Sequence, residues 1–273
     1  MDFFTARGLS QRRACQIIGV SRSTLHYQPR PDHNADMSVR LLSIAGRHRR
    51  YGSRRAWALL HRQGQRPRDT RVHRLWKRLG LQAPRRARRR RKPPKEPRTL
   101  PTQAQYPGHV WTYDFVHDAC MDGSKLKCLT VVDEFTRECL AIEVATSLPA
   151  NKVIAVLKSL VAGQRVPQFL RSDNGPEFIA EALKVWLREQ QTGTLYIDPG
   201  CPWQNGFAAS FNGKFRDECL AANLFATVVE ARALIEAYRR EYNEARPHQS
   251  LGYLTPQEFK QQWLQEQSQT TED

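Results

Sequence analysis

The chain has no long apolar run, and its six cysteines form no recognisable pattern. No stretch of the 273 residues approaches the ~18 consecutive apolar residues of a membrane-spanning helix. The polar start, residues 1–7, is too short for a secretory signal. Without a C-x-x-C pair or a zinc-type Cys/His pattern, the cysteines predict reduced thiols in a cytoplasmic protein that binds neither zinc nor a membrane.

Acidic residues are scarce in the first hundred positions. Residues 1–100 hold 27 of the 43 Lys and Arg but only 5 of the 27 Asp and Glu, a net charge of +22, and the remainder carries −6. A field this one-sided predicts a nucleic-acid partner. A membrane surface is less favoured, because no amphipathic segment with a large apolar face accompanies the charge.

Residues 1–32 are expected to form a helix-turn-helix domain. Ser10 and Ser21 are suited to N-caps, and Gly19 to the end of the first helix. The expected small core consists of Leu9, Ala14, Ile17, Ile18, Val20 and Leu25. The second helix would present Arg22, Ser23 and His26 to DNA. A plain helical hairpin is the alternative.

Residues 37–82 predict a second helical DNA-binding domain, followed by a basic Arg/Pro linker over 83–105. Successive helices show basic outward faces, so phosphate contacts are expected at Arg54, Arg55, Arg71 and Arg74. The linker is expected to be disordered alone and to order along the phosphate backbone through Arg85, Arg86, Arg88, Arg89, Arg90, Arg91 and Lys92.

From residue 106 the pattern changes to strands alternating with helices. Strands are predicted at 109–116, 126–133, 138–145, 167–172 and 195–197, and helices from about 149, 176 and 203. The order βββαβαβα predicts an α/β domain over 106–225 with a mixed five-stranded sheet and flanking helices.

A C-terminal helical extension is expected over 226–263 and a disordered polar tail over 264–273. The helix of about 227–244 is predicted to pack through Val229, Ala233, Leu234, Ala237 and Tyr238. The polar segment 246–249 is either a helix-ending structural motif or a contact to DNA, and the sequence does not choose between them.

Two aspartates stand out in the predicted sheet. Asp114 lies in an aromatic-rich strand, where a buried charge is costly unless it is paired or binds a metal, and Asp173 ends another strand. Two carboxylates brought together favour a hard divalent cation. The alternative is that Asp114 pairs with a basic residue and Asp173 caps a helix.

The helix from about 203 to 220 has two different faces at 100° per residue. Phe207, Phe211 and Phe215 should pack on the sheet together with Ala208 and Cys219. Asn205, Ala209, Asn212 and Arg216 lie on the opposite face, where alanine interrupts an otherwise polar surface. The position of Ala209 is where a third carboxylate could complete a site.

Long motifs resemble the retroviral-integrase-like transposases of bacterial insertion sequences, of the kind encoded by a second reading frame. They are residues 111–115, 131–137, 172–178, 199–207, 211–216 and 242–252, and the resemblance covers nearly the whole chain. It implies a ribonuclease-H-like fold and an Asp-Asp-Glu triad with 35 residues between the second and third acids. That spacing from Asp173 leads to position 209, which holds Ala209.

The resemblance implies two-metal phosphoryl transfer with Mg²⁺, or alternatively Mn²⁺, held by Asp114 and Asp173. The implied partners are duplex DNA with terminal inverted repeats, target DNA, a second or further copy of the chain, and the upstream reading-frame product, in a nucleoid-associated protein. DNA contacts near the site are expected at Asn205, Asn212, Lys214 and Arg216.

Because Ala209 removes a catalytic acid, this version is expected to bind DNA and to be inactive or strongly impaired in cleavage and strand transfer. One alternative is a non-catalytic repressor of the element. Another is a ribonuclease-H-type nuclease, which the helix-turn-helix disfavours.

Overall fold

The computed structural model describes residues 2–28, 32–82, 102–163, 166–173, 175, 180–198 and 201–272. Its contacts divide the chain into two units, Met1–Ser43 and Ile44–Asp273. No helix in the described part is both long enough and apolar enough to span a bilayer. All six cysteines are free thiols, as predicted.

The first unit contains short helices joined by the predicted turns: α1 (Asp2–Thr5), α2 (Gln11–Ile18), α3 (Arg22–Leu25) and the start of α4 (Ala35–Arg47). Ser10 and Ser21 cap α2 and α3, accepting from the backbone N–H groups of Arg13 and Thr24. Gly19 ends α2 in the left-handed conformation at φ 73°, which glycine adopts without a steric penalty.

The core expected for the first unit was only partly right. Ala14 is buried, together with Cys15, whereas Ile17, Ile18 and Val20 are 55, 47 and 39% exposed. The reason is that α3 has only four residues and offers little surface against which α2 could bury its apolar side chains.

The second unit begins with the end of α4, followed by α5 (Ser53–Arg62) and α6 (Asp69–Arg78). Val72, Leu75 and Trp76 of α6 are buried, and α5 contributes Ala56 and Leu60 to the same small core. The basic linker residues Arg85 to Lys92 lie outside the described residues.

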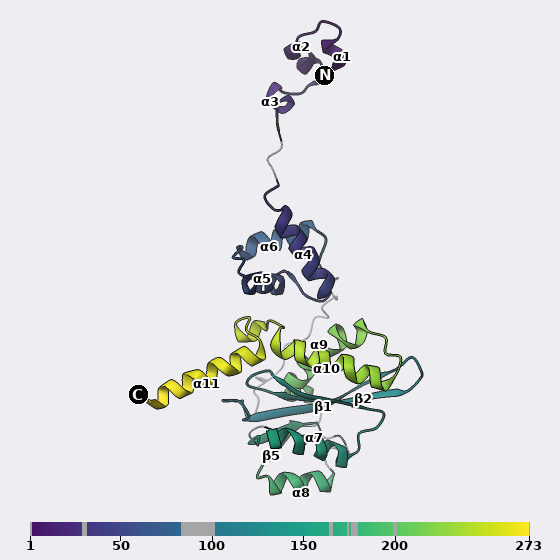
Figure 1. Ribbon diagram of the computed structural model, residues 1–273, viewed down its shortest axis with the longest axis vertical. Coiled ribbons are helices and arrows are strands. Elements are labelled where there is room, and N and C mark those ends of the chain that lie inside the picture. The colour runs from purple at the N-terminus through teal and green to yellow at the C-terminus, as the bar shows by residue number, and fades with distance from the viewer. Residues whose placement is uncertain are drawn as a thin grey trace. The chain divides into compact units, whose positions relative to one another are not determined.

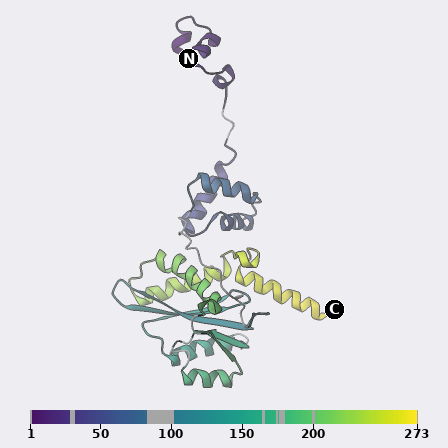
Figure 2. The same ribbon diagram turned by 180° about the vertical axis from the view of Figure 1, so that it is seen from behind.

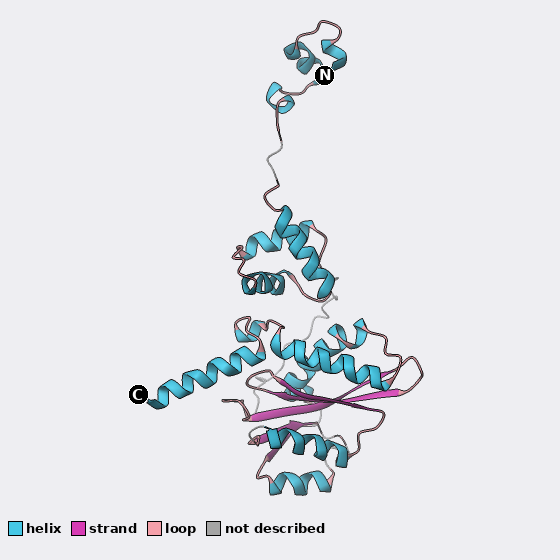
Figure 3. Cartoon of the chain, viewed as in Figure 1, coloured by secondary structure: helices cyan, strands magenta, loops and turns pink. Residues whose placement is uncertain are grey.

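A mixed five-stranded sheet forms the centre of the second unit, as predicted (Figure 1; Figure 3). Its strands are β1 (Val110–Ala119), β2 (Lys125–Asp133), β3 (Cys139–Ala145), β4 (Phe169–Ser172) and β5 (Gly193–Tyr196). Their order is β3-β2-β1-β4-β5. The meander β1–β2–β3 is antiparallel, and β4 and β5 add to β1 in parallel. Between β1 and β4 the sheet therefore changes from antiparallel to parallel pairing, and these two neighbouring strands run in the same direction.

Helices cover both faces of the sheet, as the opposite views show (Figure 1; Figure 2). On one face, α7 (Ala150–Gly163) and α8 (Glu181–Glu189) bury Trp111 and Tyr113 of β1. On the other, α9 (Gly206–Glu218) and α10 (Val228–Glu244) pack on Val116 and Cys128. Because side chains alternate along a strand, Thr112 and Asp114 share the face of Val116, beneath α9.

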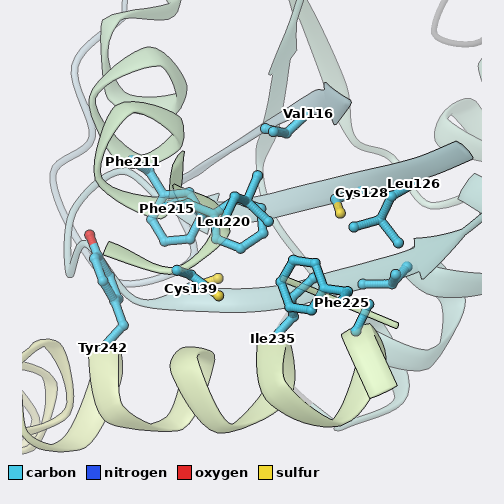
Figure 4. Packing of buried hydrophobic residues seen from close by; sticks show 14 of the residues in the cluster. Val116, Leu126, Cys128, Cys139, Phe211, Phe215, Leu220, Phe225, Ile235 and Tyr242 are labelled. Carbon is cyan, nitrogen blue, oxygen red and sulfur yellow. The ribbon is translucent and has the colours of Figure 1, made fainter. Parts of the chain in front are cut away.

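The core under α9 and α10 combines aliphatic side chains and cysteines with several aromatic rings (Figure 4). Phe211 and Phe215 extend from α9 toward the sheet, and Tyr242 comes from α10, with its ring 4.9 Å from that of Phe211. Burial of rings of this size fixes α9 in rotation as well as in position, because each ring fits a specific gap.

Three corrections concern the C-terminal half. The helix expected from 203 starts as a 3₁₀ turn over Pro202–Asn205 before α9. In α10 the buried residues are Ala231, Ile235 and Tyr242, whereas Val229 and Leu234 are exposed. The tail predicted to be disordered from 264 is instead the end of α11 (Pro256–Glu272). Short 3₁₀ turns at Leu220–Ala222 and Gln249–Leu251 complete the described elements.

Candidate active site

The parallel pairing of β1 with β4 brings the two aspartates together. Thr112 pairs with Arg171, and the same register carried two residues further places Asp114 beside Asp173. Asp173 follows β4 directly and accepts a hydrogen bond from the backbone N–H of Gly175 at 3.0 Å. The residues between Pro176 and Ile179, where a helix start was expected, lie outside the described part.

Asp114 is half-buried, and both of its carboxylate oxygens accept hydrogen bonds. The backbone N–H of Phe115 donates to Oδ1 at 2.7 Å, and the Asn212 amide donates to Oδ2 at 2.9 Å. Burial raises the pKa of Asp114, and the nearby negative charge of Asp173 adds to the rise. Two neighbouring carboxylates that repel each other in this way are suited to a shared cation.

Two side-chain bonds hold α9 over β1 on either side of position 209. The Thr112 hydroxyl donates to the Asn205 amide oxygen just before the helix, and Asn212 bonds Asp114 and accepts from Thr130 at 3.0 Å. Ala209 lies one turn from each of these asparagines. Position 209 therefore lies on α9 between two residues that bond β1, and Ala209 itself is exposed.

Among the described acids of α9, Glu218 is paired with arginines. Glu218 accepts two hydrogen bonds from Arg246, at 2.6 and 2.7 Å, and a third from Arg55 at 3.2 Å. Glu177 lies outside the described residues. Among the described side chains, no group of three His, Cys, Asp or Glu could hold a metal ion.

Family models and relatives agree with this geometry. Models described as integrase core domains match residues 104–202 and 190–256, and an HTH-like domain matches 34–90. A protein of insertion element IS407 from Burkholderia multivorans is 43% identical over 92% of this chain and 90% of its own. The chain belongs to the integrase-core family of insertion-sequence transposases.

A more distant member of the family is the putative transposase InsK of insertion sequence element IS150 from Escherichia coli K12. It is 27% identical over 89% of this chain and 90% of its own length. Among solved structures, a chain of the simian T-cell lymphotropic virus intasome has a TM-score of 0.50 at 17% identity, over 70% of this chain and 66% of that one. The sheet and its flanking helices are thus the ribonuclease-H-like fold of integrase cores.

The predicted DNA-binding residues are in different environments in this transposase. In the first unit, Arg22, Ser23 and His26 are exposed. On α5 and α6, Arg54 and Arg74 are exposed and Arg71 is half-buried, whereas Arg55 bonds Glu218. Arg55 is therefore not a free surface cation, which revises the expectation for it.

The four residues on α9 or just before it that were predicted to contact DNA also differ in their exposure. Arg216 is exposed, and its positive charge acts on Asp114. Lys214 is half-buried, and burial, with Arg246 adding to it, lowers its pKa to about 8. Asn205 and Asn212 are each only 6% exposed. Their amides bond β1 rather than facing solvent, so their expected contact with DNA is replaced by a positioning role.

Other motif residues serve the fold. Asp133 accepts backbone N–H groups from Gly108, Phe135 and Thr136 and so shapes the turn after β2. Glu134 forms a fully buried ion pair with Arg171 at 2.8 Å. The segment 246–249, left open by the sequence, contributes the buried Arg246 to the bonds with Glu218.

Three residues near the site were not anticipated as important. Thr112 and Thr130 carry the hydroxyls that hold α9, and Arg137 lies over the Phe207 ring at 3.9 Å. Phe207 was expected to pack on the sheet but is only half-buried. A buried threonine facing a helix asparagine leaves a weak signal in sequence, because threonine is common in strands for its β-branched shape alone.

Proposed function

We propose that this transposase binds the ends of its insertion sequence and that its core is built for metal-dependent strand cleavage and strand transfer, which Ala209 disables. The observation that supports the proposal is that Asp114 and Asp173 lie side by side on β1 and after β4, while Asn205 and Asn212, one turn on either side of position 209, bond the same strand β1. Half-buried carboxylates from two adjacent strands, close enough that the charge of Asp173 raises the pKa of Asp114, are suited to phosphoryl-transfer chemistry.

The site fits a hard divalent cation such as Mg²⁺, because its ligands would be carboxylate oxygens. Those of Asp114 also accept N–H groups. Asp114 and Asp173 would hold it, and bound there it would supply Lewis-acid activation of water or of a DNA 3′-hydroxyl. Asn212 and the Phe115 N–H orient the Asp114 carboxylate, and Arg216 places positive charge beside it. A methyl group at Ala209 contributes neither a ligand nor a charge.

The proposed partners are duplex DNA with terminal repeats, target DNA and further copies of the chain, because joining two ends requires two sites. The exposed arginines of α3, α5 and α6 are the proposed phosphate contacts. The upstream reading-frame product is a further proposed partner.

The test is to restore the acid. With Mg²⁺ and labelled duplexes of the element's end, Ala209→Glu should cleave at least about 100-fold faster than the unchanged chain, the scale of one catalytic group. Ala209→Gln, with the same shape but no charge, should remain inactive, and Asp114→Asn should abolish the activity that Ala209→Glu gains. Equal cleavage by the unchanged chain and Ala209→Glu would refute the proposed defect.

A second candidate function is a non-catalytic repressor of the element, and Ala209 is the observation that favours it. If Ala209→Glu binds end duplexes as tightly as the unchanged chain but still cuts nothing, the repressor is the better assignment.

A further inference from the structure

A cavity of about 300 Å³ lies on the flank of α9 away from the aspartates. Its lining includes the cations Arg137 and Lys214, the rings of Phe207, Phe211 and Tyr242, and His248. No acidic residue lines it. Its volume is at the small end of ligand-binding pockets, and its chemistry combines aromatic surface with positive charge.

His248 is a buried polar side chain with one ring nitrogen that makes no hydrogen bond to the described residues. Its ring is 4% exposed, and Nε2 has no hydrogen-bond partner among the described residues. Burial, together with the charge of Arg246, lowers its pKa to about 2, so the ring is neutral. A backbone hydrogen bond to Tyr242 occupies the other ring nitrogen, Nδ1, which leaves Nε2 as an acceptor. Unsatisfied buried acceptors are rare in native proteins.

The outer surface of α9 between the cavity and the aspartates consists of small residues. At 100° per residue, the order around the helix from Ala209 is Gly213, Gly206, Ser210 and then the cavity residues Lys214 and Phe207. All four of the small residues are exposed. A Cβ added to Gly206 or Gly213 would meet no atom within 4 Å, so no described residue covers the helix at these two positions.

A DNA strand could follow this surface closely. The helix is roughly 10 Å wide, a distance that a strand covers in about three nucleotides at ~3.4 Å each. Residues larger than glycine, alanine or serine along this path would hold the backbone away from the helix.

We propose that the cavity holds one unstacked nucleotide of a DNA strand that crosses α9 from the aspartate pair. Its base lies against the stacked Arg137 and Phe207, its phosphate binds Lys214, and an exocyclic amino group donates to Nε2 of His248. Stacking on aromatic rings and arginine planes is how proteins hold unpaired bases. The acceptor at His248 favours adenine, cytosine or guanine over thymine, which lacks such an amino group. The inference rests on the proposed function, because it requires DNA at Asp114 and Asp173.

The experiment uses the full chain with Ala209 unchanged, so that bound DNA stays uncut. End duplexes carry 2-aminopurine at one position each, over about the last six nucleotides of either strand. Unstacking in the cavity should raise the fluorescence at one position on binding. Replacing that nucleotide by an abasic site should weaken binding by about tenfold.

Ser210→Trp should close the cavity mouth from an exposed position, remove the fluorescence rise and weaken binding by about tenfold. Val229→Trp, equally bulky on an exposed part of α10, is the matched control and should change neither. If Ser210→Trp unfolds, Gly213→Leu on the same path provides the second variant with the same expectation.

The outcomes separate the two proposals. Tight binding with no fluorescence rise at any position, or a rise that survives both Ser210→Trp and Gly213→Leu, overturns the cavity assignment and leaves the proposed function intact. An unchanged chain that does not bind any end duplex overturns both.

Discussion

At the scale of single residues, several buried polar side chains of the core have specific hydrogen-bond partners in the protein. Asn205 meets Thr112, Asn212 meets Asp114 and Thr130, and Asp133 collects three backbone N–H groups. A buried polar group without such a partner costs about 1–3 kcal/mol, so each pairing also specifies where its element sits. Ala209 lies on α9 between two of these residues, Asn205 and Asn212.

His248 makes the stability of the protein depend on pH. Its folded pKa, about 2, is below the unfolded value of 6.5, so the unfolded chain binds the extra proton and stability falls as pH drops below 6.5. Lowering the pH from about 7.5 to about 5.5 should therefore cost about 1 kcal/mol from this residue. Urea denaturation at the two pH values measures the loss, and His248→Gln should reduce it by that amount.

A control for this prediction is His26→Gln, since His26 is exposed in the first unit. It should leave the pH dependence as it is in the unchanged chain. If His248→Gln and the unchanged chain lose the same stability between the two pH values, the ring is not held neutral in the fold.

At the scale of elements, three sides of α9 face three different parts of the protein. Phe211 and Phe215 pack on the sheet, Asn212 and Ala209 face the aspartates, and Phe207 faces the cavity. The hydrophobic burial holds the helix (Figure 4), and the asparagine bonds fix its register along β1. A shift of one residue would remove position 209 from the site.

The end of α9 is tied to the segment after α10 by Glu218 and Arg246. Arg246 is 2% exposed and donates twice to the Glu218 carboxylate. Glu218→Ala should destabilise the protein by about 3–5 kcal/mol, because it leaves a buried guanidinium without a counter-charge. The free energy of unfolding in urea measures this.

The comparison for that prediction is Glu181→Ala, which removes an exposed pair with Arg188 at 3.6 Å. It should cost less than about 1 kcal/mol. Similar losses from both substitutions would mean that Arg246 finds other partners.

At the scale of the whole molecule, charge is divided along the chain. The first hundred residues carry most of the basic residues, and the ribonuclease-H-like core with its C-terminal helices is net acidic. DNA binding should therefore depend strongly on salt, with affinity falling about 10³-fold between ~50 and ~200 mM salt. Fluorescence anisotropy of an end duplex across this range gives the slope.

Within that prediction, Arg74→Gln on exposed α6 should reduce the salt slope by about one, the value of one phosphate contact. Arg188→Gln on α8 removes the same charge far along the chain and should leave the slope unchanged. A slope that neither substitution alters would place the phosphate contacts on other basic residues.

Local patterns predicted much of this molecule. The five strands, the caps at Ser10 and Ser21, and the face of α9 that carries Ala209 follow from alternation, capping chemistry and the helical angle. The packing face predicted for α10 was only partly right, since Tyr238 packs against the core but Val229 and Leu234 are exposed. Its apolar residues lie around more than one side, and only the partner surface selects Ala231, Ile235 and Tyr242. The extent of α11 was also missed, since a polar segment gives no hydrophobic period to read.

The sequence alone determined that the first hundred residues are strongly basic, that the core is a mixed sheet, and that one aspartate lies within a strand and another at the end of a strand, with alanine at the third position. These are properties of composition and of short periods, which neighbouring residues encode. Only the tertiary structure decided that Asn205 and Asn212 serve the sheet, that Glu218 belongs to Arg246, and that His248 faces a cavity. Those pairings join residues far apart in the chain. Local sequence does not distinguish between the many possible partners, and packing in the folded protein selects one of them.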